Sequence, residues 1–273
     1  MKSALDILKE QFQHFYLIRR LSLYELKSAN NNNYLGMAWE IINPLIHVAI
    51  YWFVFGFGIR QRAPMELQDG SAVPFLYWML AGIILWFFFY QSVIQGSRSI
   101  YTRVKLLSKM NFPMSVIPNF VIFSRLYVHF IMVMITFIIF AFSGYKITIY
   151  YLQIIYFMFS TFAFLYALTL ITSTLTTIIR DIQMFIQSSF RMLLYLSPIL
   201  WTIDRLPESL QIIMKINPLY YLIEGYRSGF FGLGWYFIEH WQYTLYFWGL
   251  TIVLFLLGSS LHVKFKRHFI DYV

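Results

Sequence analysis

Six long stretches with almost no charge constrain this chain more than any other feature. Asp, Glu, Lys and Arg are absent from five of them, residues 41–59, 70–97, 126–145, 147–179 and 240–263. In the sixth, 182–203, the only charged residue is Arg191. A helix that crosses a bilayer needs about 20 predominantly apolar residues, and a soluble core does not require six such runs. The chain is therefore predicted to be an all-α integral membrane protein with six transmembrane helices.

Composition and charge agree with the membrane class and disfavour others. Only 12% of the 273 residues are charged, against about 25% in soluble globular domains. The formal charge of +9 is explained by the excess of Lys and Arg in cytoplasmic loops. We therefore expect membrane lipids, and no nucleic acid, as partners. The chain has no cysteine, which excludes a disulfide framework and a thiolate metal site.

The basic residues between the predicted spans set the orientation. The spans cover about residues 39–59, 74–97, 116–142, 149–178, 183–202 and 241–263. The connections on the side of the two termini hold 13 of the 21 Lys and Arg residues, the opposite connections hold six, and Arg125 and Arg191 lie within spans. Because cytoplasmic loops carry the basic excess, we predict a multi-pass plasma-membrane protein with both termini in the cytoplasm.

Residues 1–33 differ in character from the transmembrane domain predicted at 34–267. Apolar residues recur there at a spacing of three to four, with polar residues on the other side, which is typical of an amphipathic helix. Such a helix either lies in the membrane interface or packs on the protein itself, and both alternatives are open. The apolar positions are Leu5, Leu8, Phe12, Phe15 and Ile18, and the polar ones are Asp6, Lys9, Glu10 and Gln13.

The stretch 204–239 is predicted to form short re-entrant helices between the fifth and sixth spans. A full span here would place Lys215, Glu224 or Arg227 in hydrocarbon, at about 2.5–3.5 kcal/mol each. Two short helices that enter the outer leaflet and bend at Pro218 avoid this cost.

The usual signatures of catalysis are missing. The sequence contains no G-x-x-x-x-G-K-[ST] phosphate-binding loop, no H-E-x-x-H pair and no G-x-S-x-G elbow. Its six histidines are scattered without metal-ligand spacing. Each of these motifs supplies a specific chemistry, so we expect this chain to have no catalytic chemistry, no metal and no cofactor of its own. Transport or scaffolding is the expected role.

Arginines inside spans and a dense set of aromatic residues are the candidate substrate contacts. A charge at that depth normally faces the bundle interior or water, and a guanidinium pairs well with phosphate. Arg125 and Arg191 therefore either contact a pyrophosphate-bearing substrate or pair internally, with a carbonyl or with Glu40. Aromatic side chains either line a path for sugars or belong to the interfacial belt. The aromatic candidates are Trp86, Tyr195, Trp201 and Tyr220.

The segment 98–115 between the second and third spans is basic and amphipathic. Its apolar side chains could dock in a cleft of a partner while its Lys and Arg residues approach acidic groups. Alternatively, it is a basic cytoplasmic loop that rests on anionic lipid. These residues alone support the two alternatives equally.

Several runs of residues together carry a resemblance to a known family. They are YELKSANNNNYLGMAWEIINPLIHVAI, YWMLAGIILWFFFYQSVIQGSRSIYTRVKLLSKMNFP, TTIIRDIQMFIQSSFRMLLYLSPILW and, after the Asn217-Pro218 break, EGYRSGFF. In this order they resemble the type-2 ABC transporter permeases of the polysaccharide-export group, over nearly the whole chain. YWFVFGFGIR, QGSRSIYTRV and RDIQMF are most similar to the membrane subunit of the wall teichoic acid exporters of Gram-positive bacteria.

This resemblance implies a function and an assembly. It implies a permease that flips wall teichoic acid, linked to undecaprenyl diphosphate, across the plasma membrane. It also implies two copies of this chain with two copies of a cytoplasmic ATPase subunit, on which ATP and Mg are bound. Coupling to that ATPase is expected in residues 100–113, with the N-terminal helix, and at the second cytoplasmic turn. The implied coupling residues are Arg103, Lys105, Leu106, Lys109, Phe112, Pro113, Arg180 and Asp181.

Other cargoes and other classes of protein are alternatives. The same fold would serve an O-antigen or capsular polysaccharide exporter, and a drug or lipid efflux permease is a third alternative. A membrane scaffold would not need an arginine as deep as Arg191. An integral polymerase would need acidic clusters that the loops lack.

Overall fold

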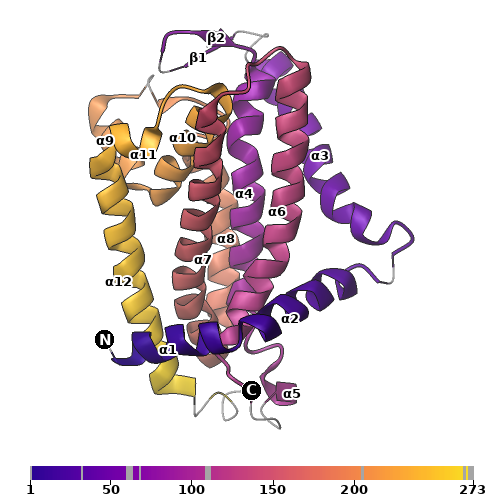
Figure 1. Cartoon of the computed structure of the whole chain (residues 1–273), viewed down its shortest axis with the longest axis vertical. Helices are drawn as coiled ribbons and strands as arrows, with labels where there is room; N and C mark the ends of the chain where they lie inside the picture. The colour runs from indigo at the N-terminus through magenta and orange to yellow at the C-terminus, as the bar shows by residue number, and fades with distance from the viewer. Residues whose placement is uncertain are drawn as a thin grey trace.

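A computed structural model describes residues 2–31, 33–59, 64–67, 69–107, 112–203, 206–266 and 269. Its long helices run side by side as a bundle, and short helices and a small β-hairpin cover the two ends (Figure 1). The start of the chain and the end of the last helix lie at the same end of this bundle (Figure 1). This is what an even number of crossings requires.

Among the described residues, five helices are long and apolar enough to cross a membrane. The first, Gly36–Ile59, joins η1 (Gly36–Ala38), α3 (Trp39–Tyr51) and a π-helical turn, η2 (Trp52–Ile59). The others are α4 (Phe75–Ser97), α6 (Val116–Phe142), Ile149–Ile178, made of η3 (Ile149–Leu152) and α7 (Gln153–Ile178), and α12 (Trp241–Phe265). They lie where five of the spans were predicted, because each contains most of a charge-free run, although the first also includes Glu40 and α6 includes Arg125.

The remaining predicted span corresponds to α8 (Asp181–Leu196), which has 16 residues. At 1.5 Å per residue it is about 24 Å long, shorter than the roughly 30 Å of hydrocarbon in a typical bilayer. The helix ends before the predicted limit at residue 202 because Ser197 precedes Pro198 and adopts an extended backbone, with ψ at 150°. A residue before proline is disfavoured in the helical region.

Helix α4 is the centre of the bundle. It packs against α6, α7, α8 and α10 (Pro218–Phe231), and 72% of its most apolar window is buried. Phe89 of α4 stacks between Phe164 and Phe190, with ring centroids 6.0 and 5.9 Å away. At Gly96, a Cβ atom would lie 2.6 Å from the side chain of Thr169. The absence of a side chain there lets α7 approach α4 closely.

The predicted re-entrant region consists of α9 (Glu208–Ile216), α10 and α11 (Tyr236–Glu239), between α8 and α12. It lies at the end of the bundle opposite the chain start, beside the hairpin of β1 (Met65–Glu66) and β2 (Ala72–Val73) (Figure 1). The expected bend is at Asn217-Pro218. Asn217 accepts a hydrogen bond from the Leu219 backbone N–H at 3.0 Å, and Pro218 begins α10. This is the usual pairing of an N-cap with proline at the first helical position.

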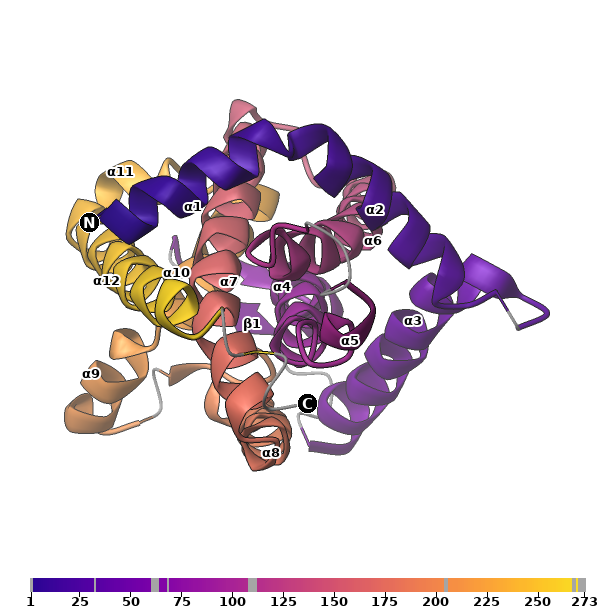
Figure 2. The ribbon, with the colours of Figure 1, turned by 90° about the horizontal axis from the view of Figure 1, so that it is seen from below.

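The N-terminal segment forms two helices, α1 (Lys2–Gln13) and α2 (Phe15–Ser28), which run across one end of the bundle (Figures 1 and 2). Their inner face packs on the protein and buries Ala4, Ile7, Ile18 and Leu26. Ile18 was expected to share one apolar face with Leu5, Leu8, Phe12 and Phe15, but it lies on the inner face instead. The other expected apolar residues face outward, and Phe12 is 81% exposed. The segment therefore packs on the protein with one face and presents the other to its surroundings.

Candidate functional site

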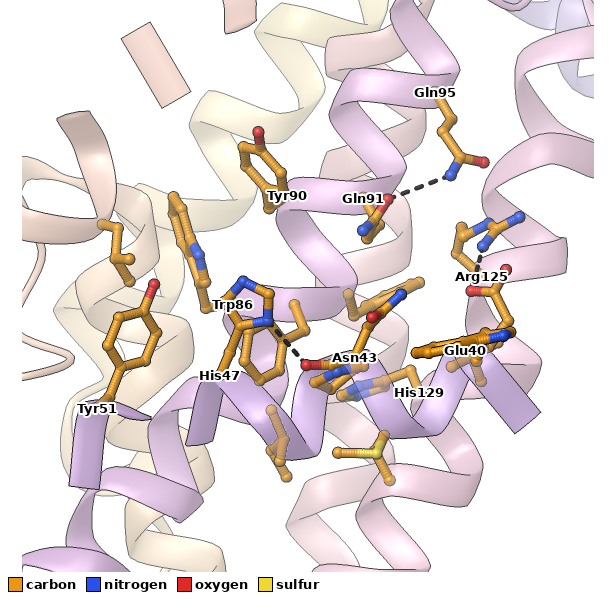
Figure 3. A pocket seen from close by; sticks show the side chains of 18 of the residues that line it. Glu40, Asn43, His47, Tyr51, Trp86, Tyr90, Gln91, Gln95, Arg125 and His129 are labelled. Atoms are coloured by element: carbon orange, nitrogen blue, oxygen red, sulfur yellow. Dashed lines mark hydrogen bonds and ion pairs between the residues drawn. The ribbon is translucent and has the colours of Figure 1, made fainter. Parts of the chain in front are cut away.

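A cavity of about 620 Å³ lies between α3, α4, α6 and α8. Helical periodicity explains its walls, since residues three or four apart share a face of a helix. On α3 the lining includes Glu40, Asn43, His47 and Tyr51, and on α4 it includes positions 84, 86, 87, 88, 90, 91 and 95. Figure 3 shows the labelled side chains of both helices converging on the same space. The cavity is therefore lined by one stripe of α3 and by a broader face of α4.

Five of the seven predicted substrate-path residues line this cavity, and two do not. The five are Glu40, Trp86, Arg125, Arg191 and Tyr195. Trp201 instead donates its indole N–H to the Tyr195 backbone carbonyl at 2.8 Å. Tyr220 lies against Tyr243 of α12, with ring centroids 6.3 Å apart. Neither of the last two residues is part of the cavity wall.

Arg125 and Glu40 form an ion pair at one side of the cavity. An Arg125 guanidinium nitrogen lies 2.7 Å from a Glu40 carboxylate oxygen, and the Arg125 side chain is only 5% exposed. Asn30 donates its amide N–H to the other oxygen of Glu40 at 2.7 Å. The internal pairing considered from the sequence is therefore the arrangement of Arg125, and it neutralises a charge that would be costly at this depth.

Arg191 differs from Arg125 in its surroundings. It lies on α8, is exposed, and faces the same cavity. Within the described part of the chain, no acidic side chain lies within ion-pair distance of it. A guanidinium that faces a cavity and has no carboxylate partner there can bind an anionic group of a ligand.

Neutral amides of the cavity were missed by the sequence reasoning. Gln91 and Gln95 are one helical turn apart on α4, and Gln95 donates to Gln91 at 3.2 Å. On the facing helix, Asn43 supplies another side-chain amide to the cavity lining, and its backbone carbonyl lies 2.8 Å from Nδ1 of His47 (Figure 3). The sequence feature that could have indicated them is the four-residue spacing of two glutamines within a charge-free run, which places both on one face of the helix. Amides and aromatic rings together suit the hydroxyls and apolar faces of sugars.

The inner wall of the cavity is fixed by His129 of α6. Its Nε2 lies 2.7 Å from the hydroxyl of Tyr226 in α10, and its ring stacks on Phe88 at a centroid distance of 4.7 Å. The side chain is only 2% exposed. His129 thus links the cavity wall to the re-entrant helix.

Arg227 of α10 makes a second buried connection. It pairs with Glu224 at 2.5 Å and donates to the Pro198 carbonyl at 2.7 Å. Its guanidinium carbon lies 3.4 Å from the centroid of the Trp78 ring. One side chain therefore joins α10, α4 and the chain that leaves α8. The sequence placed Arg227 outside the spans but did not predict these contacts.

The predicted coupling residues lie at the end of the bundle that carries α1 and α2. Arg103 is half-buried, and Leu106 of the short helix α5 (Val104–Leu107) is 71% exposed, next to the exposed Lys105. Phe112 and Pro113 are half-buried beside the start of α6, and Arg180 and Asp181 are exposed at the turn between α7 and α8. Lys109 lies outside the described residues.

The described residues contain no cluster of three or more His, Asp or Glu side chains that could hold a metal ion. The cavity holds Glu40, His47 and His129, but Glu40 is engaged by Arg125, and His129 by Tyr226.

A family model described as ABC-2 type transporter matches residues 16–231 of the chain. The chain belongs to the ABC-2 type transporter family. The match includes α2, the cavity-forming helices α3, α4, α6 and α8, and the re-entrant helix α10. The chain is accordingly a membrane subunit of a transporter, and membership of an ABC family implies an ATPase partner.

Individual relatives of this ABC-2 protein match it along most of its length. An O-antigen export system permease protein RfbA of Klebsiella pneumoniae is 27% identical over 265 residues, which covers 94% of this chain and 95% of the relative. A second one from the same organism is 25% identical over 260 residues, with the same coverage of both chains. The RfbA protein of Myxococcus xanthus is 24% identical over 227 residues, covering 82% and 84%.

Proposed function

We propose that this chain is the membrane permease subunit of an ATP-driven exporter of a surface polysaccharide of the O-antigen type. The observation that carries the proposal is the match with O-antigen export permeases over 94% of the chain. The cavity supports it, because its amides, aromatic rings and Arg191 suit a sugar polymer with an anionic lipid carrier. O-antigen, which the sequence analysis gave as an alternative, is therefore favoured over wall teichoic acid, the cargo that the resemblance implied. The relatives give no support to teichoic acid or to a Gram-positive source.

The proposed assembly contains two copies of this chain and two copies of a separate cytoplasmic ATPase subunit, which binds ATP and Mg. The proposed substrate is a polymer linked to undecaprenyl diphosphate, moved from the inner to the outer leaflet. The 100–113 segment and the turn at Arg180 and Asp181 would contact the ATPase. The exposed Leu106, next to Lys105, gives that contact an apolar centre with a basic neighbour.

Within the cavity, the residues would have different roles. Arg191 would hold a phosphate oxygen of the lipid carrier, since an arginine fork matches phosphate geometry. Gln91 and Gln95 would exchange hydrogen bonds with sugar hydroxyls, and Trp86 would offer a ring for the apolar face of a sugar. The pair of Arg125 and Glu40 is internally neutral, so it would shape the cavity wall without attracting the carrier.

The test of the proposed function is a transport assay with the reconstituted complex of this chain and its ATPase. Two lipid-linked polymers would be compared, an O-antigen-type polysaccharide and a polyol-phosphate polymer of the teichoic acid type. We expect export and ATPase stimulation with the polysaccharide. Export of the polyol-phosphate polymer alone would reverse the assignment of the cargo, and export of neither would contradict the proposed function.

The role of Arg191 is tested in the same vesicles. Arg191→Gln removes the charge and should abolish the stimulation of ATPase activity by the lipid-linked substrate, while Arg191→Lys, which keeps the charge but not the fork, should retain part of it. The basal ATPase rate serves as the control for assembly. Full stimulation of the Gln variant would show that Arg191 does not contact the carrier.

A further inference from the structure

The segment between α4 and α6, residues 98–115, is crossed on one side by α1 and α2. Seen from below, α2 passes beside the start of α6, and α1 continues toward α12 (Figure 2). The short helix α5 lies within this segment. The family resemblance implied that the coupling segment acts together with the N-terminal helix, but it did not identify contacts between them. The structure brings them into direct contact at two points.

The first contact is an ion pair between α2 and the start of α5. The guanidinium of Arg103 pairs with the carboxylate of Glu25, and both side chains are about three-quarters covered. The same guanidinium donates to the Ser99 carbonyl at 3.2 Å and to the Thr102 hydroxyl at 3.0 Å. Arg103 also lies 5.7 Å from the ring centroid of Phe120 in α6. Glu25 therefore holds the side chain that organises the turn into α5.

The second contact is a buried set of hydrogen bonds at the other end of the segment. Gln11 of α1 donates to the Ser115 hydroxyl at 3.0 Å and accepts from the Asn119 amide at 2.8 Å. The Ser115 hydroxyl in turn donates to the carboxylate of Glu10. Gln11 is only 8% exposed. Buried polar groups of this kind are costly to leave unpaired, so the contact fixes where the segment enters α6.

In its described part before α6, residues 98–107, the segment has an inner and an outer face. Ile100 and Val104 are fully buried against Ile18 of α2 and Val116 of α6. Leu106, two residues after Val104, is 71% exposed on the outer side. The inner face is thus locked to the N-terminal helices and the outer face is left for a partner.

The N-terminal helices carry their own exposed apolar face. Phe12, Phe15 and Tyr16 are 81%, 54% and 71% exposed at the middle of the α1–α2 pair. Their neighbours Arg19 and Arg20 are also exposed. Apolar and basic residues together on a helix that crosses one end of a membrane bundle are typical of contact with anionic lipid headgroups. The α1–α2 pair therefore lies between the lipid surface and the inner face of the segment.

We infer that α1 and α2 form a strap that holds both ends of the coupling segment, and that Glu25 and Gln11 are positioning residues for energy coupling. This inference rests on the proposed function, because the segment can transmit force only if an ATPase docks on its outer face. A push on Leu106 then moves α6 and the strap together. Without the strap, α5 would rotate relative to α6, and the movement of α5 would not be transmitted to α6.

The experiment uses the full complex with its ATPase in vesicles of phosphatidylethanolamine and phosphatidylglycerol. The measured quantity is polymer exported per ATP hydrolysed, with co-purification of the ATPase as a second readout. Glu25→Arg and Arg103→Glu should each lose most of this ratio while ATP hydrolysis continues. The charge-swapped double variant should recover it, because the ion pair is restored with its polarity reversed. Gln11→Leu tests the second contact and should also lower the ratio.

Asp6→Arg is the matched control, since it reverses an exposed acid on the same strap. It should keep the wild-type ratio. If Glu25→Arg does not assemble, Glu25→Gln removes the charge without a change of size and should also lower the ratio. Wild-type ratios in Glu25→Gln and Gln11→Leu, or a charge swap no better than its single variants, would overturn the strap. Failure of the wild-type complex to export any polymer would instead overturn the proposed function.

Discussion

Replacing Arg227 by methionine should destabilise the fold strongly, because this side chain satisfies several buried groups at once. The substitution keeps the length of the apolar stem and removes the charge. It leaves the Glu224 carboxylate, 14% exposed, without its cation, and breaking a buried pair costs about 3–5 kcal/mol. It also removes a donor from the Pro198 carbonyl at 2.7 Å, worth about 1–3 kcal/mol when the acceptor stays buried, and the contact with Trp78, worth about 0.5–2 kcal/mol.

These contributions overlap, because they share one guanidinium and contacts in one network do not add. We therefore expect a loss of about 4 kcal/mol rather than their sum. For a chain of this size that corresponds to a fall in Tm of about 10 °C. The double variant Arg227→Met with Glu224→Gln removes the stranded charge and should recover about half of the loss, since replacing both partners of a buried pair is far less costly than removing one.

The assay is thermal unfolding of the purified protein in one detergent at a fixed scan rate, followed by tryptophan fluorescence. Arg191→Met serves as the matched control, because it makes the same change at an exposed arginine and should alter stability by no more than about 0.5 kcal/mol. If Arg227→Met lowers the free energy of unfolding by less than about 1 kcal/mol, the stabilising role assigned to Arg227 is refuted. A double variant that is less stable than the single one would also refute the assigned role, because the stranded carboxylate would then not be the main cost.

Three further substitutions test other buried contacts by the same unfolding assay. Gly225→Ala would place a Cβ atom 2.2 Å from the Phe157 ring and should lower the free energy of unfolding by about 1–3 kcal/mol. Gly249→Ala, whose Cβ atom would have nothing within 4 Å, should be neutral or stabilising by up to about 1 kcal/mol. Equal effects of the two substitutions would contradict the close approach of α10 and α7. Asn217→Ala removes the N-cap of α10 and should lower the free energy of unfolding by about 1 kcal/mol, while Asn217→Asp should retain most of the stability of the wild type. Identical losses in the two variants would exclude a capping role. Arg125→Gln removes the cation from Glu40 and should lower the free energy of unfolding by about 3 kcal/mol, and wild-type stability would show that the pair does not stabilise the purified protein.

The spans could be predicted because the hydrocarbon core penalises charge so strongly that charge-free runs mark them directly. The end of α8 was less predictable. Its run remains apolar through Ile203, and what stops the helix is the local geometry of Ser197 before Pro198. The N-terminal helices have two faces, and only packing decides that Ile18 turns inward while Phe12 turns outward.

The cavity was predictable only where it breaks the apolar pattern. Arg125 and Arg191 stood out because each is a charge within a span. Gln91 and Gln95 did not, since a neutral amide does not interrupt a charge-free run. Aromatic residues are too frequent here, at 21% of the chain, for any one of them to indicate a path, and Trp201 and Tyr220 accordingly lie elsewhere. The contacts of Arg227 join residues about 30 and 150 positions apart in sequence, which no local pattern reveals.

The short helix α8 has a consequence for the lipid around it. A helix about 24 Å long that packs beside α4 and α7, of 23 and 26 residues, would thin the bilayer locally, at a modest cost per ångström of mismatch. The same helix presents Arg191 to the cavity. A charged headgroup that travelled beside α8 would therefore cross less hydrocarbon than it would beside α7, and bilayers of longer acyl chains should slow its passage.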